Sequence, residues 1–198
     1  MSAPGPGLRA SLLFAWRGWI LAALFAVIAV ARIFSDAPLR PPALALLILG
    51  AAWRLQAGRF ILAHSNGLRM EAGPLAFSGP YAMGRHPLYL SNLVSAAGII
   101  LFANCLPLWA MASLFAAVCL HHGMLAYEEE EHMLSVHGES YRSYMRDTPR
   151  WLGMPRKRAA AHTADPDAGS FTAGFKRQGG NLAKTGAAAI LLWGLARL

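Results

Sequence analysis

Long stretches of apolar sequence constrain this chain more than any other feature. They lie at residues 12–34, 43–56, 87–102 and 108–125, with a last one at 182–198 that is short for a membrane span. A helix needs about 20 apolar residues to cross the hydrocarbon core of a bilayer, and the longer stretches approach that length. Hydrophobic residues fill 56% of the 198 positions and charged residues only 14%, which favours a membrane protein over a large soluble core. We therefore predict an all-α fold, an integral membrane helical bundle of about five transmembrane or interfacial helices.

The positions of the basic residues predict an orientation. The turn between the third and fourth apolar stretches carries no charge, whereas the loop at 61–85 and the segment at 142–158 are basic. The positive-inside rule puts both basic segments on the cytoplasmic side. Arg9 and Arg17 put the N-terminus there as well, ahead of an apolar run that resembles a retained signal anchor. We expect an integral protein of the bacterial inner membrane.

The net charge and the cysteine and histidine residues indicate which classes of partner to expect. The net charge of +8 raises nucleic acid as a partner, but the basic residues cluster in loops and are not interleaved with aromatics as in single-strand binders. Cys105 and Cys119 form neither a disulfide framework nor a Cys-x-x-Cys pair. Three histidines lie near acidic residues, at His121, His122 and His132, without the repeated Glu-x-x-His of di-iron bundles. We predict contact with the bilayer, no nucleic acid and no metal.

Composition divides the chain into four parts. Residues 1–60 hold the N-terminal membrane helices, and 61–152 hold an apolar hairpin followed by a polar helix that is interrupted near Gly138. A flexible linker rich in Gly, Ala and Asp is expected at 153–181. The apolar segment at 182–198 is expected as a final helix that spans the membrane or lies at its surface.

Arg85, His86 and Pro87 form the first stretch that carries chemistry. Proline is favoured as the first residue of a helix and keeps the residue before it out of the helical region. Arg85 and His86 should therefore lie just outside a helix N-terminus, with Tyr89 in the first turn. The free N–H groups and dipole of that end suit an anion. The alternative is an Arg-His pair that anchors the helix among lipid headgroups, and the triplet alone leaves both open.

Four adjacent glutamates, residues 128–131, form the second such stretch. Adjacent like charges repel, so a cationic partner is expected. For Glu128 and Glu131 we favour a solvated face that pairs with Arg142 or Arg146. The tight turn of the 87–125 hairpin should bring Glu129 and Glu130 close to Arg85, His86 and Tyr89. An anion-binding wall opposite carboxylates suits a zwitterion with a further cationic centre, such as S-adenosylmethionine.

A family resemblance joins these stretches. Gly79-Pro80-Tyr81, Arg85-His86-Pro87-Leu88-Tyr89, the apolar hairpin, Glu129-Glu130, and a tail with Gly138, Tyr141, Tyr144 and Thr148-Pro149-Arg150-Trp151-Leu152 follow in that order. As a set they resemble the isoprenylcysteine carboxyl methyltransferase family, which is related to membrane phospholipid methyltransferases. The resemblance covers 79–152, under half of the chain. His137 stands where the family usually has Phe, and Met133 where it usually has Leu.

The resemblance implies S-adenosylmethionine bound at a C-terminal cytoplasmic region and a lipophilic acceptor, a carboxylate or a phospholipid amine, that enters from the bilayer. His86 and the helix N-terminus would hold the cofactor carboxylate, and Glu129 and Glu130 its ammonium or ribose. Arg150 or Arg85 would orient an anionic acceptor. The residues expected at the cofactor are Tyr81, His86, Pro87, Leu88, Tyr89, Glu129 and Glu130, and those expected to act in catalysis are Arg85, Arg150 and Glu130.

Two other functions compete with methyl transfer. Membrane sterol reductases share a similar Arg-His-Pro-x-Tyr element and a Gly-x-x-Trp/Tyr pattern and bind NADPH. They usually carry Arg-Asp where this chain has Glu129-Glu130, so the glutamate pair favours the methyltransferase. A non-enzymatic membrane partner protein is the third possibility, for which Glu130 and His86 would be dispensable.

Overall fold

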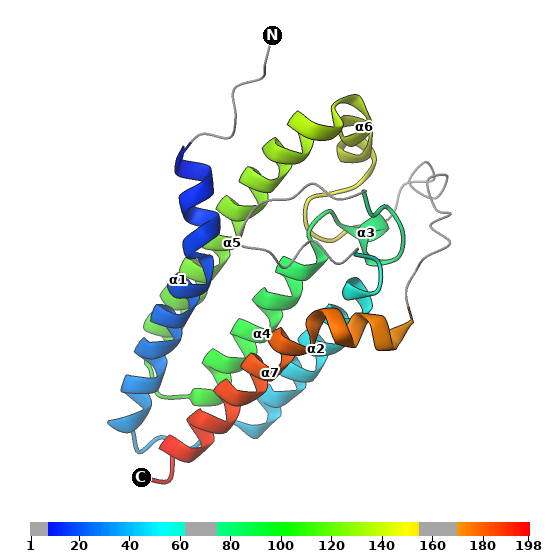
Figure 1. The fold of residues 1–198 in the computed structure, drawn as a ribbon. Helices are drawn as coiled ribbons and strands as arrows, with labels where there is room; N and C mark the ends of the chain where they lie inside the picture. Colours follow the sequence, from blue (N-terminus) through cyan, green and yellow to red (C-terminus); the bar gives the residue numbers. More distant parts are fainter. Residues whose placement is uncertain (1–7, 62–74, 155–169) are drawn as a thin grey trace.

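The computed structural model describes residues 8–61, 75–154 and 170–198 (Figure 1). The described residues are helical and contain no strand, which confirms the predicted all-α class. The elements in order are α1 Leu8–Ile33, η1 Pro41–Ala43, α2 Leu44–Gly58, α3 Pro80–Met83, α4 Pro87–Ala103, α5 Leu108–His137, α6 Glu139–Asp147 and α7 Phe171–Leu195. In Figure 1, α4 and α5 form an antiparallel hairpin, α2 packs along α4, and α7 crosses α2.

Proline and left-handed residues set the ends of the hairpin helices. Pro87 is the first residue of α4, and His86 before it has a non-helical backbone. α4 ends at Asn104, a left-handed residue with φ 47° whose amide donates to the Pro38 carbonyl over 2.8 Å. Helices commonly end with a residue in this left-handed conformation. Both ends of α4 therefore follow from local sequence, as expected.

The fourth apolar stretch and the glutamate run form one continuous helix. α5 runs unbroken from Leu108 to His137, whereas we had expected a break after residue 125. Residues 124–137 contain no Gly or Pro, and several are good helix formers. At about 1.5 Å per residue α5 is about 45 Å long, longer than the roughly 30 Å core of a bilayer. It ends at Gly138, where φ is +54°.

α7 begins earlier than the sequence predicts. It starts at Phe171 rather than at 182, so residues 171–181 are helical and not a linker. The hydroxyl oxygen of Ser170 accepts from the Ala173 N–H and caps the helix. Glycine is tolerated there because α7 packs closely on α2: a Cβ at Gly174 would lie 2.9 Å from the Leu55 carbonyl oxygen. Residues 155–169 of the expected linker lie outside the described residues.

Among the residues that the structure describes, two helices are long and apolar enough to cross a membrane, at Phe14–Ile33 and Leu108–His137, as judged by length and composition. Only 6% of the apolar window in the first of them is buried within the protein. The buried apolar cluster lies near the α4–α5 turn. It is made by Ile28, Leu47, Ile99, Ile100, Phe102, Ala103, Met111 and Leu192. The polar stretches gather at the other end of the hairpin.

Candidate functional site

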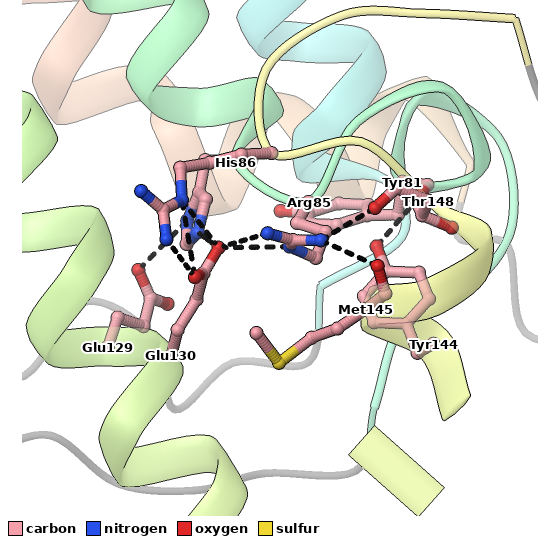
Figure 2. Close-up of polar contacts among 9 residues, drawn as sticks. Tyr81, Arg85, His86, Glu129, Glu130, Tyr144, Met145 and Thr148 are labelled. Carbon is pink, nitrogen blue, oxygen red and sulfur yellow. Dashed lines mark hydrogen bonds and ion pairs between the residues drawn. The ribbon is translucent and has the colours of Figure 1, made fainter. Parts of the chain in front are cut away.

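Arg85 and His86 lie beside Glu129 and Glu130, which α5 presents from the opposite side (Figure 2). The His86 Nε2 atom is 3.0 Å from Glu130 Oε1, and His86 Nδ1 is 3.5 Å from Glu129 Oε2. Arg85 Nε donates to Glu130 Oε1 over 2.9 Å. The proximity that we expected from the tight hairpin is present.

Glu130 is the centre of this ion cluster. Arg85, Arg150 and His86 all contact its carboxylate, and Arg150 Nη2 makes the shortest contact, 2.7 Å to Oε2. The Glu130 side chain is only 3% exposed, whereas that of Arg150 is 40% exposed. A buried carboxylate is tolerated when several cationic donors surround it. Glu130 therefore holds the cluster together from inside, and Arg150 leads from it to the surface.

A second contact, which no sequence motif predicted, holds the backbone of the cluster in place. Residues 83–86 pair by backbone hydrogen bonds with 149–153: Arg85 N donates to Pro149 O over 3.0 Å, and Gly153 N donates to Met83 O over 2.9 Å. Arg85 Nη1 also donates to the Met145 and Thr148 carbonyls. Gly84 permits this approach, because a Cβ there would lie 1.5 Å from the Trp151 carbonyl oxygen.

Aromatic side chains surround the cluster. The His86 ring stacks on Tyr89 with a centroid distance of 5.5 Å, and Tyr89 in turn meets the edge of His122. The Tyr89 phenol also interacts electrostatically with Glu129. Buried Tyr144 donates to the Tyr81 carbonyl over 2.7 Å and so holds α6 against α3 (Figure 2).

Pro87 and Leu88 act through the backbone of α4. Pro87 is buried as the first residue of the helix, and the Leu88 carbonyl accepts from the Ser91 hydroxyl over 2.6 Å. Both were predicted at the cofactor. The structure gives them the role of fixing the helix start that carries His86 and Tyr89.

The cluster raises the pKa values of two of its cationic members, His86 and Arg150. Burial lowers the pKa of His86, but hydrogen bonds to Glu129 and Glu130 outweigh it, and the pKa is raised above its ordinary value. The pKa of the Arg150 guanidinium is raised by its hydrogen bond to Glu130. His86 is therefore stabilised as an imidazolium between two carboxylates.

The outer charges pair differently from expectation. Arg142 and Arg146 contact Glu139, over 3.2 Å and 3.1 Å. We had expected them to pair with Glu128 or Glu131. Glu139 is the first residue of α6, three residues before Arg142 on the same helix, a spacing at which side chains meet. All three side chains are more than half exposed, so these pairs add little stability.

A polar chain deeper in the bundle was missed by the sequence patterns. Arg54 Nε donates to Gln178 Oε1 over 2.9 Å, and Arg54 Nη1 donates to Asn92 Oδ1. Asn92 Nδ2 lies 3.1 Å from His122 Nε2, and His122 Nδ1 lies 2.9 Å from the Val118 carbonyl oxygen. Polar residues inside apolar helices usually face one another and serve function, which is the signal that was available.

A groove of about 750 Å³ opens beside the cluster between α4 and α5. Its walls are mostly apolar, and its polar end holds Glu128 and Arg150. The lining residues are Leu90, Leu93, Cys119, Leu120, Gly123, Met124, Tyr127, Glu128, Arg150 and Trp151. Arg150 thus faces the groove on one side and Glu130 on the other.

The donor set fits part of S-adenosylmethionine. Glu129 is 41% exposed at its side chain and faces the cluster with one oxygen, so it has surface left for an ammonium or a ribose hydroxyl. Glu130 is fully committed to Arg85, Arg150 and His86. Of the two carboxylates, that of Glu129 is therefore the one with free surface, and that of Glu130 supports the cluster.

No family model, no curated protein and no solved structure matches this chain.

Proposed function

We propose that this protein is an integral membrane methyltransferase that uses S-adenosylmethionine and methylates a lipophilic acceptor. The observation that carries the proposal is the junction of Arg85-His86 with Glu129-Glu130 over distances of 2.9 to 3.5 Å. These two stretches are 43 residues apart (129 − 86), and each is part of the motif set that resembles the methyltransferase family.

S-adenosylmethionine supplies an activated methyl group: a bond forms from the acceptor to the methyl carbon as the carbon–sulfur bond breaks, and its electrons neutralise the sulfonium. The protein contributes alignment and exclusion of water. Glu129 binds the cofactor's cationic part. Glu130, buried beneath it, fixes Arg85, His86 and Arg150 so that the site is formed before the ligand arrives.

The groove and Arg150 support an amphipathic acceptor with an anionic head. The apolar walls suit a lipid chain, and a 40% exposed guanidinium at one end suits a carboxylate. Arg85 is only 9% exposed and is bonded to Glu130, Met145 and Thr148, so Arg150 is the better candidate to orient the acceptor. A carboxylate acceptor also needs no general base.

The outer surface of the helices supports a membrane location. α1 leaves most of its apolar window exposed, and large apolar side chains face outward along the bundle. The most exposed include Trp19, Phe34, Leu108, Trp109 and Ile190. So many exposed large apolar side chains are unusual on proteins in water but normal in lipid. The site would then lie at the cytoplasmic surface, where α5 extends beyond the bilayer core.

Calorimetry on the detergent-purified chain tests the cofactor. We expect S-adenosylhomocysteine to bind the wild type, and Glu129→Gln to weaken that binding by about 10-fold or more through loss of a charged hydrogen bond. Glu131→Gln, an exposed neighbour on the same helix, is the matched control and should bind as the wild type does. Binding of NADPH without binding of S-adenosylhomocysteine would replace the proposal with the reductase alternative.

Radiolabelled S-adenosylmethionine incubated with protein and lipid extracts tests the acceptor. We expect label in an organic-soluble product, and for a carboxylate acceptor the label should be released as volatile methanol by mild alkali. Label that resists alkali would instead indicate an amine acceptor. Label confined to the aqueous phase would contradict a lipophilic substrate.

A further inference from the structure

A third carboxylate would be electrostatically unfavourable at His86. Both ring nitrogens of His86 already face carboxylates, Glu129 at 3.5 Å and Glu130 at 3.0 Å. A ligand carboxylate placed there would be repelled by both. The predicted role of His86, to hold the carboxylate of the cofactor, therefore needs another cation.

Arg54 of α2 is a half-buried cation that bonds to α4. Its hydrogen-bond partners in the described part of the chain are Gln178, Ser91 and Asn92, all of them neutral. Gln178 is fully buried, and its Nε2 donor has no hydrogen-bond partner there. A guanidinium and an amide donor in such surroundings favour an anionic acceptor.

Arg54 and Glu129 reach the same face of α4. Glu129 contacts His86, whose ring stacks on Tyr89, and Arg54 bonds to Asn92, which lies three residues after Tyr89 in the helix. Residues at that spacing are neighbours on one face, about one turn or 5 Å apart along the axis. His122 touches both positions, since its ring meets Tyr89 and its Nε2 meets Asn92. One carboxylate and one guanidinium thus flank a single turn of α4.

Tyr81 is an electrostatic neighbour of both charged groups. Its phenol interacts electrostatically with Glu129 and with Arg54, with opposite signs. Tyr81 is buried and is held by its neighbour Tyr144, so it provides a fixed wall beside the two charged groups.

We propose that Arg54 and Glu129 bind the two charges of an α-amino-acid group, Arg54 the carboxylate and Glu129 the ammonium. S-adenosylmethionine carries such a group, so this rests on the proposed function. Gln178 and Asn92 act as positioning residues for Arg54. α2 and α7, which carry none of the methyltransferase-like motifs, thereby contribute to the cofactor site.

Two ligands that differ only in the amino-acid part test this directly. S-adenosylhomocysteine carries it, and methylthioadenosine keeps the nucleoside and thioether without it. Calorimetry in detergent should show that Arg54→Gln weakens S-adenosylhomocysteine by about 10- to 100-fold and leaves methylthioadenosine unchanged. Unchanged binding of methylthioadenosine also shows that the variant is folded. Arg54→Lys should fall between the two, because it keeps the charge and loses the forked geometry.

Two other arginines serve as comparisons. Arg40→Gln removes one positive charge from an exposed position at the opposite end of the bundle and should bind both ligands as the wild type does. Arg17 of α1 also interacts electrostatically with Glu129 and Tyr89, so Arg17→Gln is the stricter comparison.

The outcomes separate the role of Arg54 from the proposed function. A selective loss of S-adenosylhomocysteine in Arg54→Gln alone supports the assignment. The same selective loss in Arg17→Gln alone, equal loss of both ligands in Arg54→Gln, or no change in Arg54→Gln overturns it while the proposed function stands. Failure of the wild type to bind S-adenosylhomocysteine overturns the proposed function itself.

Discussion

Removal of the Glu130 charge should destabilise the protein more than any other change to a single acidic residue of the cluster. Glu130→Gln keeps the size and removes the charge that Arg85, His86 and Arg150 share. Arg85 and His86 are 9% and 3% exposed at their side chains, so both would be left as buried cations without this partner.

The magnitude follows from burial. Loss of one partner from a buried ion pair typically costs about 3–5 kcal/mol. The Arg150 contact adds less than about 1 kcal/mol, because its side chain is 40% exposed and screened by solvent. We expect Glu130→Gln to lower the free energy of unfolding by about 3–5 kcal/mol, a large part of the roughly 5–15 kcal/mol of a typical protein.

Unfolding in mixed micelles with rising sodium dodecyl sulfate, followed by helical circular dichroism, measures this change. Glu131→Gln is the control, an exposed residue that should shift stability by no more than about 0.5 kcal/mol. Double-mutant cycles should give a larger coupling of Glu130 with Arg85 than with Arg150. A loss below about 1 kcal/mol for Glu130→Gln, or equal couplings, would refute the view that Glu130 is the buried centre of the cluster.

Three further predictions concern other parts of the molecule. Because the pKa of His86 is higher in the folded protein than the ordinary 6.5, His86 adds stability that is fully present below about pH 6.5 and lost as the pH rises through its folded pKa; urea unfolding between pH 5 and 9 should show this slope in the wild type and lose it in His86→Asn. Gly84→Ala, whose Cβ would lie 1.5 Å from the Trp151 carbonyl oxygen, should lower the thermal midpoint sharply, whereas Gly186→Ala, with nothing within 4 Å, should hold or raise it; equal midpoints would contradict the pairing of the two segments. Ala23→Asp, at an exposed mid-helix position of α1, should oppose insertion by about 2.5–3.5 kcal/mol and lower the alkali-resistant membrane fraction of the protein; an unchanged fraction would argue that α1 does not span the bilayer.

The sequence alone predicted the helices that depend on local signals. Apolar length located α1, α2, α4 and α5 to within a few residues at most of their ends, except at the C-terminus of α5. Pro87 marked the start of α4, and Gly138 marked the break after α5. These residues act through their own backbone preferences, so they have the same effect in any fold.

The extent of α5 and α7 required the tertiary structure. The change from apolar to acidic residues after 125 suggested a boundary, but a helix continues through polar residues when nothing breaks it. Glycine in 171–181 suggested a linker, yet Gly174 lies where α2 approaches α7 too closely for a side chain. The polarity of a segment indicates the environment of a helix, but it does not show where the helix begins or ends.

Half of the candidate site was accessible from the sequence. The Arg-His-Pro triplet and the glutamate pair were placed together because a short turn returns a helix beside its predecessor, which is a geometric consequence of hairpin length. The sequence did not distinguish Glu129 from Glu130 by depth, and only packing made Glu130 buried and left Glu129 partly open.

The polar chain deeper in the bundle joins four different helices, and no spacing along the sequence connects its members, Arg54, Asn92, His122 and Gln178. The backbone pairing of 83–86 with 149–153 likewise joins segments more than 60 residues apart. The sequence determined the helices and the residue types that can carry charge in this bundle. Only the tertiary structure decided which charges meet, because contact between distant segments depends on how whole helices pack and not on the residues beside each charge.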